Sequence, residues 1–261
     1  MNMAAWRLPL LTFISLLLLW EGVVTLFGVP DYLVPSPLQI AALIPARIGD
    51  LLGALRVTGT EALGGFLLSA LVGVATGLCF SVSSLIRRSF YPYVVLLQTI
   101  PIIAISPLIL LWLGNGSLSV LFISFLISVP AVVVNTTQGL ISVDANLVNL
   151  FRMGNAGVPT LLFKLRLPNA LPHIFVGLKI AAGASVVGAL VGETFAGTSA
   201  LGTGGLGYSA VYALSQLDTP YLFALILTSS LLGLLFFLVV IIAERLTVGS
   251  WHESLLADHA D

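Results

Sequence analysis

Residues 221–243 read YLFALILTSSLLGLLFFLVVIIA, an apolar stretch without a charged side chain. A helix needs about 20 mostly apolar residues to cross the hydrocarbon core of a bilayer, and this stretch is long enough. The whole chain agrees, because 58% of its 261 residues are hydrophobic and only 8% are charged. A soluble domain carries roughly 25% charged residues, so the polar surface here is too small to cover a water-soluble fold. The sequence therefore predicts an integral membrane protein.

The same composition excludes several other classes of protein. The high apolar fraction excludes disordered and collagen-like chains, and a single cysteine, Cys79, excludes an internal disulfide. A formal net charge of −1 offers no basic face to nucleic acid, so we expect no nucleic-acid partner. Because Cys79 lies in an apolar run, we expect it to pack in the core rather than to act as a reactive thiol.

Five more stretches of similar character occur along the chain. We therefore expect a single all-α, polytopic membrane domain over residues 1–261. Its six transmembrane helices are expected at 8–29, 57–82, 91–113, 118–137, 171–196 and 221–243. The first stretch follows Arg7 as a signal peptide would, but its length, its Glu21 and the lack of a small-residue cleavage site before Pro30 favour a retained helix.

Six spans place both termini on one side of the membrane, and the basic residues indicate which side. With a cytoplasmic N-terminus, the outer side holds only Arg47 and Arg56. The inner side then holds eight basic residues, namely Arg7, Arg87, Arg88, Arg152, Lys164, Arg166, Lys179 and Arg245. This distribution predicts a multi-pass protein of the cell (inner or plasma) membrane with both termini in the cytoplasm.

The connections between the predicted spans differ in length. Residues 114–117 form a tight outer turn, and residues 83–88 form a short inner loop. The outer segment 30–56 is long enough for a surface helix that opens at Pro37, after the expected N-cap Ser36. The longest inner connection, 139–170, has an amphipathic pattern of its own. Connections of this length are usually functional, so we expect a partner to dock there.

No pattern in the chain points to catalysis or to a bound nucleotide. Neither Lys164 nor Lys179 lies in the GxxxxGK[ST] pattern that cradles phosphates. Residues 202–207 match GxGxxG without the surrounding strand–turn–helix unit, which predicts a tight or mobile outer loop instead. The chain has three histidines, at His173, His252 and His259, and they do not have the spacing of metal ligands. We therefore expect no catalytic residue, no metal site and no cofactor in this chain.

Four ionisable side chains lie in the spans or at their ends, namely Glu21, Glu61, Lys179 and Glu193. Such residues are costly in a bilayer and are functional hypotheses by default. Plainer alternatives exist, because Glu61 can reach water at the outer end of its helix, Lys179 can snorkel to the inner surface, and a hydrogen bond or protonation can neutralise Glu21. Glu193 either lines a pathway or braces the glycine-rich loop that follows it.

Prolines and polar groups cluster in the third and fourth spans. Pro92, Pro101, Pro107 and Pro130 bend helices and free carbonyls, which a bilayer protein tolerates where they face protein or a water-filled path. Ordinary helix packing explains the glycines of the spans well, but it explains this clustering less well. We therefore expect a translocation path and gate flanked by Gln98, Thr99, Pro101, Asn135, Glu193, Gly205, Leu206, Gly207 and Tyr208.

The inner segment 155–172, NAGVPTLLFKLRLPNALP, resembles the cytoplasmic signature of ABC importer permeases. The likeness rests on the Leu-Pro-x-x-Leu-Pro ending at 167–172 and the Gly-Leu-Lys at 177–179. Further similar motifs lie at 97–101, 107–108, 135–139 and 205–208. The resemblance covers about residues 35–251, and it is strongest to the branch that carries nitrate, sulfonate, taurine, bicarbonate and thiamine-pyrimidine precursors.

This resemblance implies the membrane-spanning subunit of an ATP-driven importer, with a family-like core at about 57–243. It implies a cytoplasmic coupling helix between the fourth and fifth spans, within a coupling segment at about 139–170. The implied partners are a second copy of the chain, two cytoplasmic ATPase subunits that bind ATP and Mg²⁺, and an extracytoplasmic solute-binding protein.

The family resemblance also places the contact with the ATPase. The acidic residue of the signature falls at Val148 or Asn149, neither of which is acidic, and its glycine falls at Gly154 or Asn155. The expected contact residues are Asp144, Arg152, Gly154, Asn155, Ala156, Gly157, Val158, Pro159, Thr160, Leu161 and Leu162. We expect residues 155–162 to enter the ATPase groove, on a helix that Pro168 and Pro172 stop.

The solute is expected to be small and polar, either a vitamin precursor such as a pyrimidine or an anion such as sulfonate, nitrate or bicarbonate. The spans carry no basic residue in their middle, which argues against a strong anion site. Segment 164–168 is more similar to the vitamin-precursor members. One alternative is an ATP-independent secondary transporter coupled through Glu21 or Glu193. Another is a membrane-embedded scaffold or enzyme subunit, against which the lack of a catalytic set argues.

Overall fold

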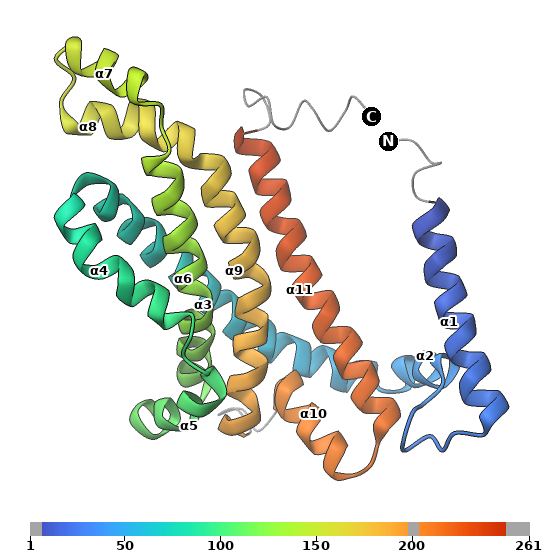
Figure 1. Ribbon diagram of the computed structural model, residues 1–261. Helices are drawn as coiled ribbons and strands as arrows, with labels where there is room; N and C mark the ends of the chain where they lie inside the picture. Colours follow the sequence, from blue (N-terminus) through green and yellow to red (C-terminus); the bar gives the residue numbers. More distant parts are fainter. Residues whose placement is uncertain (1–6, 198–203, 249–261) are drawn as a thin grey trace.

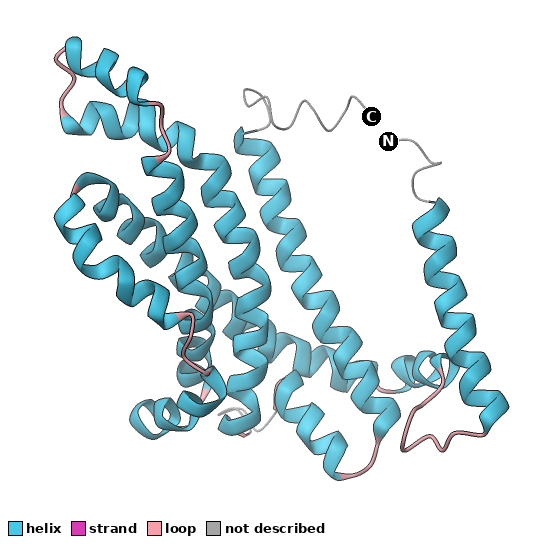
Figure 2. Ribbon diagram, in the orientation of Figure 1, coloured by secondary structure: helices cyan, strands magenta, loops and turns pink. Residues whose placement is uncertain are grey.

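A computed structural model describes residues 7–197 and 204–248, and in this part of the chain the regular elements are all helices (Figures 1 and 2). The long helices are α1 (Arg7–Phe27), α3 (Ile48–Val82), α6 (Ser117–Ile141), α9 (Leu167–Ala196) and α11 (Thr219–Val248). The shorter helices are α2 (Pro37–Ala46), α4 (Ser84–Leu97), α5 (Ile102–Leu113), α7 (Ala145–Met153), α8 (Val158–Leu161) and α10 (Leu206–Ser215). A π-helical turn, η1 (Leu162–Arg166), joins α8 to α9.

Five helices in the described residues are long and apolar enough to cross a membrane. Helices α4 and α5 are long enough only together, and the pair is bent by 101°. The predicted third span, 91–113, is therefore not one continuous helix. Pro101 has no N–H to continue the ladder of α4, and it disfavours helical geometry at the preceding Ile100. The chain leaves the helix at Gln98 and starts α5 after Pro101.

Two other boundaries differ from the prediction. The second span begins at Ile48 and runs for 35 residues, so the segment before 57 is already helical. The predicted inner loop 83–88 shrinks to Ser83, because the Ser83 hydroxyl accepts a hydrogen bond from the Ile86 N–H (3.3 Å) and caps α4 directly. The tight turn at 114–117 is confirmed, since α5 ends at Leu113 and α6 begins at Ser117.

The predicted surface helix is confirmed as α2. Ser36 is its N-cap, and a capping box links the Gln39 N–H to the Ser36 hydroxyl (3.3 Å) and the Ser36 N–H to the Gln39 side chain (2.8 Å). Pro37 occupies the first turn, where its missing N–H costs nothing. Glu21 of α1 accepts a hydrogen bond from the Leu38 N–H (3.1 Å), which ties α2 to the first span.

Helix α6 forms the centre of the bundle, with α3 packed on one side and α9 on another. Small residues allow this close approach. A Cβ at Gly73 of α3 would lie 2.6 Å from the Cβ of Val132, and one at Gly188 of α9 would lie 2.7 Å from the Cα of Ser124. The Ser124 hydroxyl also donates to the Ser185 carbonyl (2.8 Å), a hydrogen bond between α6 and α9.

The peripheral elements divide between the two ends of the bundle (Figure 1). Helices α7 and α8 lie at one end, on the same side as the Arg7 end of α1 and the Val248 end of α11. Helices α2, α5 and α10 lie at the opposite end. This arrangement is what an even number of membrane crossings produces.

Candidate functional site

The segment between α6 and α9 begins with a capped and clearly terminated helix. The Asp144 carboxylate accepts a hydrogen bond from the Asn146 N–H (2.7 Å) and caps α7. At the other end, the Asn155 N–H bonds to the Arg152 carbonyl and the Ala156 N–H to the Phe151 carbonyl, both at 3.0 Å. This is a Schellman motif. Its left-handed residue is Asn155 (φ 54°), so the conformation that favours glycine lies at Asn155 and not at Gly154.

The expected stop at Pro168 and Pro172 is wrong, because the chain stays helical from Val158 to Ala196, over 39 residues. The π-turn η1 explains the difference, since the Leu167 N–H reaches back five residues to the Leu162 carbonyl. This shift places Pro168 in the first turn of α9, where a proline is tolerated. Helices α8 and α9 therefore form one continuous helical arm, whereas α7, in the first part of the coupling segment, is separate from it.

The predicted contact residues differ in exposure. Asn155, Gly157, Val158 and Pro159 are exposed, whereas Leu161 is buried. Of the other predicted contact residues, three are exposed (Asp144, Arg152 and Gly154) and three are half-buried (Ala156, Thr160 and Leu162). Large apolar side chains extend the exposed face, with Met153 76% exposed and Phe163 60% exposed. An apolar face at the end of the bundle is typical of a surface that a protein partner covers.

The structure brings two of the predicted path residues together. Gln98, at the break after α4, and Asn135, on α6, line one cavity of about 540 Å³. Its remaining walls come from the end of α4, the break after it, α5, α6 and α9, and they are apolar, at Leu97, Ile100, Ile102, Ile105, Leu126, Ile127, Pro130, Ala131, Val134 and Ile180. Thr99 and Pro101 lie in the break itself, next to Gln98. All the lining side chains are uncharged.

Backbone irregularities add polar groups to this cavity. Pro130 has no N–H, so the Leu126 carbonyl one turn earlier loses its helical partner, and both residues line the cavity. The Asn135 amide donates to the Ala131 carbonyl (2.8 Å), and its side-chain oxygen takes no part in that bond. Neutral donors and acceptors among apolar walls are typical of sites for small polar molecules.

The other predicted path residues form a separate, buried cluster. The Glu193 carboxylate of α9 is 2% exposed and accepts a hydrogen bond from the Gly207 N–H (2.6 Å). The Leu206 N–H donates to the Thr58 hydroxyl of α3 (2.8 Å). Side chains of α3 and α9 thus satisfy N–H groups that the first turn of α10 leaves without a helical partner. These contacts favour the bracing role of Glu193 over the pathway role.

The sequence of this cluster is adapted to close contact. A Cβ at Gly205 would overlap the Glu193 carboxyl group, and one at Gly207 would overlap the Leu190 carbonyl oxygen. The expected loop is therefore a helix start, with Gly205 as the N-cap of α10 and Tyr208 in its first turn. Residues 202 and 203, also expected in the loop, lie outside the described part of the chain.

Glu61 joins the same cluster, and the expectation that it reaches water is wrong. Its side chain is 5% exposed, and with Glu193 and Ser117 it lines a very small cavity where α3, α6 and α9 meet. The long N-terminal extension of α3 explains this burial, because Glu61 lies well inside a helix that begins at Ile48.

Sequence reasoning missed an ion pair in the bundle. Lys179 of α9 was expected to snorkel to the inner surface, but its ammonium group lies 2.9 Å from the Glu244 carboxylate of α11. Both side chains are largely buried, with 24% and 11% of their surface exposed. The sequence could have indicated this pair, because a single charged side chain within a span is costly and usually has an oppositely charged partner at a similar depth in the membrane.

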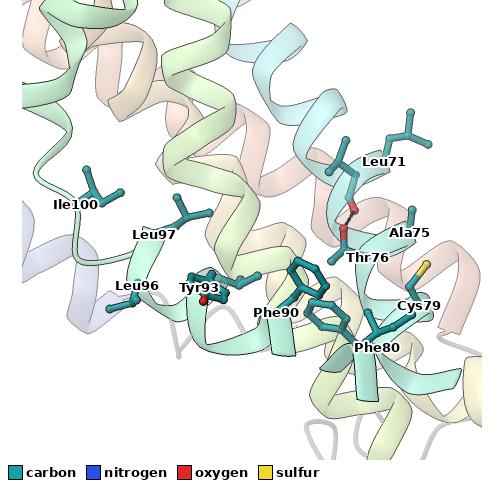
Figure 3. A pocket seen from close by; sticks show the side chains of 13 residues that line it. Leu71, Ala75, Thr76, Cys79, Phe80, Phe90, Tyr93, Leu96, Leu97 and Ile100 are labelled. Carbon is teal, nitrogen blue, oxygen red and sulfur yellow. Dashed lines mark hydrogen bonds between the residues drawn. The ribbon is translucent and has the colours of Figure 1, made fainter. Parts of the chain in front are cut away.

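An apolar groove of about 780 Å³ lies between α3 and α4 (Figure 3). Cys79 is exposed there, so the expectation that it packs in the core is wrong.

Among residues 7–197 and 204–248, no group of three His, Cys, Asp or Glu side chains could hold a metal ion. His252 and His259 lie beyond the described residues.

Comparison with known proteins adds a family. The sequence model of the binding-protein-dependent transport system inner membrane component matches residues 65–248. The formylaminopyrimidine transport permease protein ThiX of Halalkalibacterium halodurans is 35% identical over 237 residues, covering 89% of this chain and 91% of the relative. The riboflavin transport system permease protein RibX of Chloroflexus aurantiacus is 30% identical, covering 93% of this chain and 89% of the relative.

Proposed function

The chain belongs to the family of binding-protein-dependent transport system inner membrane components, and on this premise we propose that it is the membrane-spanning subunit of an ATP-driven solute importer. Two copies would form the path, two ATPase subunits would bind at the α7–α8 end, and a solute-binding protein would deliver the solute to the opposite end. ATP and Mg²⁺ would bind to the ATPase partners and not to this chain. The exposed apolar face at Met153, Val158 and Phe163 supports docking at the α7–α8 end.

The proposed orientation places α7, α8 and both termini in the cytoplasm. It is supported by the basic residues, because Arg87, Arg152 and Arg166 belong to the α7–α8 end. Arg47 lies at the opposite end, between α2 and α3, where it pairs with Asp218 (3.1 Å). A membrane protein retains most of its loop arginines and lysines in the cytoplasm.

The proposed mechanism uses the continuous arm from α8 to α9. A movement of the ATPases would push α8, and because η1 keeps the chain helical, the push would tilt α9 together with α6, on which it packs. The cavity at Gln98 and Asn135 has walls from both α6 and α9, so this tilt would open or close it. Glu193, at the far end of α9, would carry α10 along. Tilting of packed helices around a central site is the general form of alternating access.

The single observation that carries the solute class is the neutral lining of the Gln98–Asn135 cavity. Amide groups and freed carbonyls can hydrogen-bond a neutral heterocycle without a counter-charge, whereas an anion is usually held by arginine or lysine. We therefore propose a neutral, nitrogen-containing vitamin precursor of the pyrimidine type rather than a sulfonate, nitrate or bicarbonate. The likeness to the formylaminopyrimidine permease supports the same class.

Uptake into proteoliposomes tests this proposal. The chain would be reconstituted with its ATPase and its binding protein, and uptake of labelled formylaminopyrimidine and of an alkanesulfonate would be compared with and without ATP. We expect uptake of the pyrimidine only with ATP. Uptake of the sulfonate alone would overturn the solute class, and uptake without ATP or ATPase would support a secondary transporter instead.

A further inference from the structure

A polar cavity of about 400 Å³ lies at the end of the bundle that carries α7 and α8. Three arginines from different elements line it, namely Arg87 of α4, Arg152 of α7 and Arg166 of η1. The other lining residues are Ser81, Val82, Ser84, Ile141, Val158, Leu161 and Leu162. Elements far apart in the sequence thus bring three positive charges to one concave site.

The described residues supply no counter-charge to this site. Within 7–197 and 204–248, the ion pairs join Arg47 to Asp218 and Lys179 to Glu244, and neither involves the three cavity arginines. Because all three arginines line the same cavity, their positive charges are gathered there. Like charges that converge in a partly desolvated cavity repel one another, and an anion between them relieves that repulsion.

Arg166 is held in place in the wall of this cavity. Its Nη1 donates to the Ser81 carbonyl at the end of α3 (2.6 Å), and the residue is half-buried. A guanidinium group has five N–H donors in a fixed plane, so four remain after this bond. Arginines of this kind bind phosphate oxygens with good geometry, often through two hydrogen bonds each.

The apolar groove between α3 and α4, drawn in Figure 3, begins at residues that adjoin this basic cavity in the sequence. Consecutive residues of α4 connect the two, because Ile86 lines the groove and Arg87 lines the cavity. From there the groove extends past Phe90 and Tyr93 toward Leu71 and Ile100, with almost entirely apolar walls. Since α3 and α4 belong to the apolar spans, this groove lies at the depth of lipid acyl chains.

We propose that the cavity binds the phosphate group of an anionic phospholipid, whose acyl chain lies in the adjoining groove. Basic pockets between membrane helices on the cytoplasmic side bind the head groups of anionic lipids. The groove favours a lipid over free phosphate, which has no apolar part to bury. It also favours a lipid over a carboxylate of a protein partner, because the groove runs along the membrane spans and away from α7 and α8, although both of these helices contribute to the cavity itself.

Native mass spectrometry of the purified full-length chain tests the head-group site. Retention of phosphatidylglycerol would be compared with that of phosphatidylcholine for the wild type, for Arg87→Gln and for Arg88→Gln. Arg88 carries the same charge one residue further along α4 but does not line the cavity. We expect phosphatidylglycerol binding to fall about tenfold in Arg87→Gln, as for the loss of one charge-assisted hydrogen-bond pair, and to persist in Arg88→Gln. Equal binding by the two variants would overturn the proposal.

Inorganic phosphate and a groove variant separate the sources of the phosphate group. Cys79→Trp places a bulky ring in the groove, and Cys79→Ser is its matched control. We expect Cys79→Trp to weaken phosphatidylglycerol binding while Cys79→Ser does not. If inorganic phosphate binds with the same dependence on Arg87 and phosphatidylglycerol does not bind, the ligand is free phosphate and the lipid proposal is wrong. If Arg87→Gln leaves lipid binding unchanged and weakens assembly with the ATPase, the cavity serves a protein partner and the proposal is equally overturned.

Discussion

The two ends of the arm formed by α8 and α9 carry opposite kinds of surface. At the α8 end, Gly157, Val158 and Pro159 are exposed, and the neighbouring Met153 and Phe163 present apolar side chains to the outside. At the far end of α9, Glu193 is buried, and its carboxylate holds the Gly207 N–H at the start of α10. One end presents an exposed face, where we propose that a partner docks, and the other end holds the chain's own helices together.

This difference separates coupling from stability. A substitution at the exposed end removes contacts with a partner but few contacts within the chain. A substitution at the buried end breaks hydrogen bonds that no water replaces, so it lowers the free energy of unfolding. The following variants test the difference, from the largest expected effect to the smallest.

Gly157→Glu is expected to have the largest effect, and on transport alone. A Cβ at Gly157 would meet only the Pro159 side chain at 3.8 Å, so the folded chain has room for the new residue. The added carboxylate would lie on the proposed ATPase contact, and we expect uptake in proteoliposomes to fall to the level seen without ATP. Gly157→Ala is the matched control and should transport normally. Normal uptake by Gly157→Glu would refute docking at this end.

Gly207→Ala is expected to have the largest effect on stability. Its Cβ would overlap the Leu190 carbonyl oxygen, and overpacking of this kind costs about 2–3 kcal/mol of unfolding free energy. Gly183→Ala on α9 is the control, because a Cβ there meets nothing within 4 Å. Thermal unfolding in detergent compares the two variants. Equal unfolding temperatures would show that the α10 start is not packed as described.

Glu193→Leu against Glu193→Gln tests the hydrogen bond itself. Gln keeps an oxygen that can accept from the Gly207 N–H, whereas Leu leaves that N–H buried without a partner, at a cost of about 2 kcal/mol. We expect Glu193→Gln to unfold close to the wild type and Glu193→Leu to unfold at a lower temperature. The same loss in both variants would mean that the negative charge, and not the acceptor, is what this end of α9 requires.

The Lys179–Glu244 pair lies between the two ends and is expected to have the smallest effect. Lys179→Met leaves the Glu244 carboxylate without its partner and should cost about 1 kcal/mol, since both groups keep some contact with water. The double variant Lys179→Met/Glu244→Leu should recover most of this loss. A double-mutant cycle on unfolding midpoints measures the coupling, and strictly additive effects would argue against the pair.

Local patterns predicted the features of the fold that depend on neighbouring residues. The Ser36–Pro37 start of α2 and the long apolar stretches follow from side-chain chemistry that acts within a few positions. A common site for Gln98 and Asn135 could be expected, because ordinary helix packing explains the prolines and amides of these spans less well than a path does. The family resemblance of segment 155–172 pointed independently to a transport protein.

Features that depend on distant segments could not be predicted in this way. The burial of Glu61 requires the extension of α3 and the approach of α9, and the partner of Lys179 lies on α11. The continuity of α8 with α9 depends on one π-turn, in which the Leu167 N–H bonds to the carbonyl five residues earlier instead of four. Sequence patterns do not indicate this change of hydrogen-bond partner. Prolines that predict a helix stop in isolation are accommodated where neighbouring helices support the chain.

The central claim is that the push at α8 changes access to the cavity at Gln98 and Asn135. The most direct measurement uses an Asn135→Cys variant in a Cys79→Ser background, assembled with its ATPase and binding protein. The rate of modification by a membrane-impermeant thiol reagent would be measured without nucleotide and with trapped ATP, with Thr25→Cys on the exposed face of α1 as the control. We predict a rate that changes between the two nucleotide states and falls when solute is present, while the control rate stays constant. Equal rates at position 135 in both states would contradict the account.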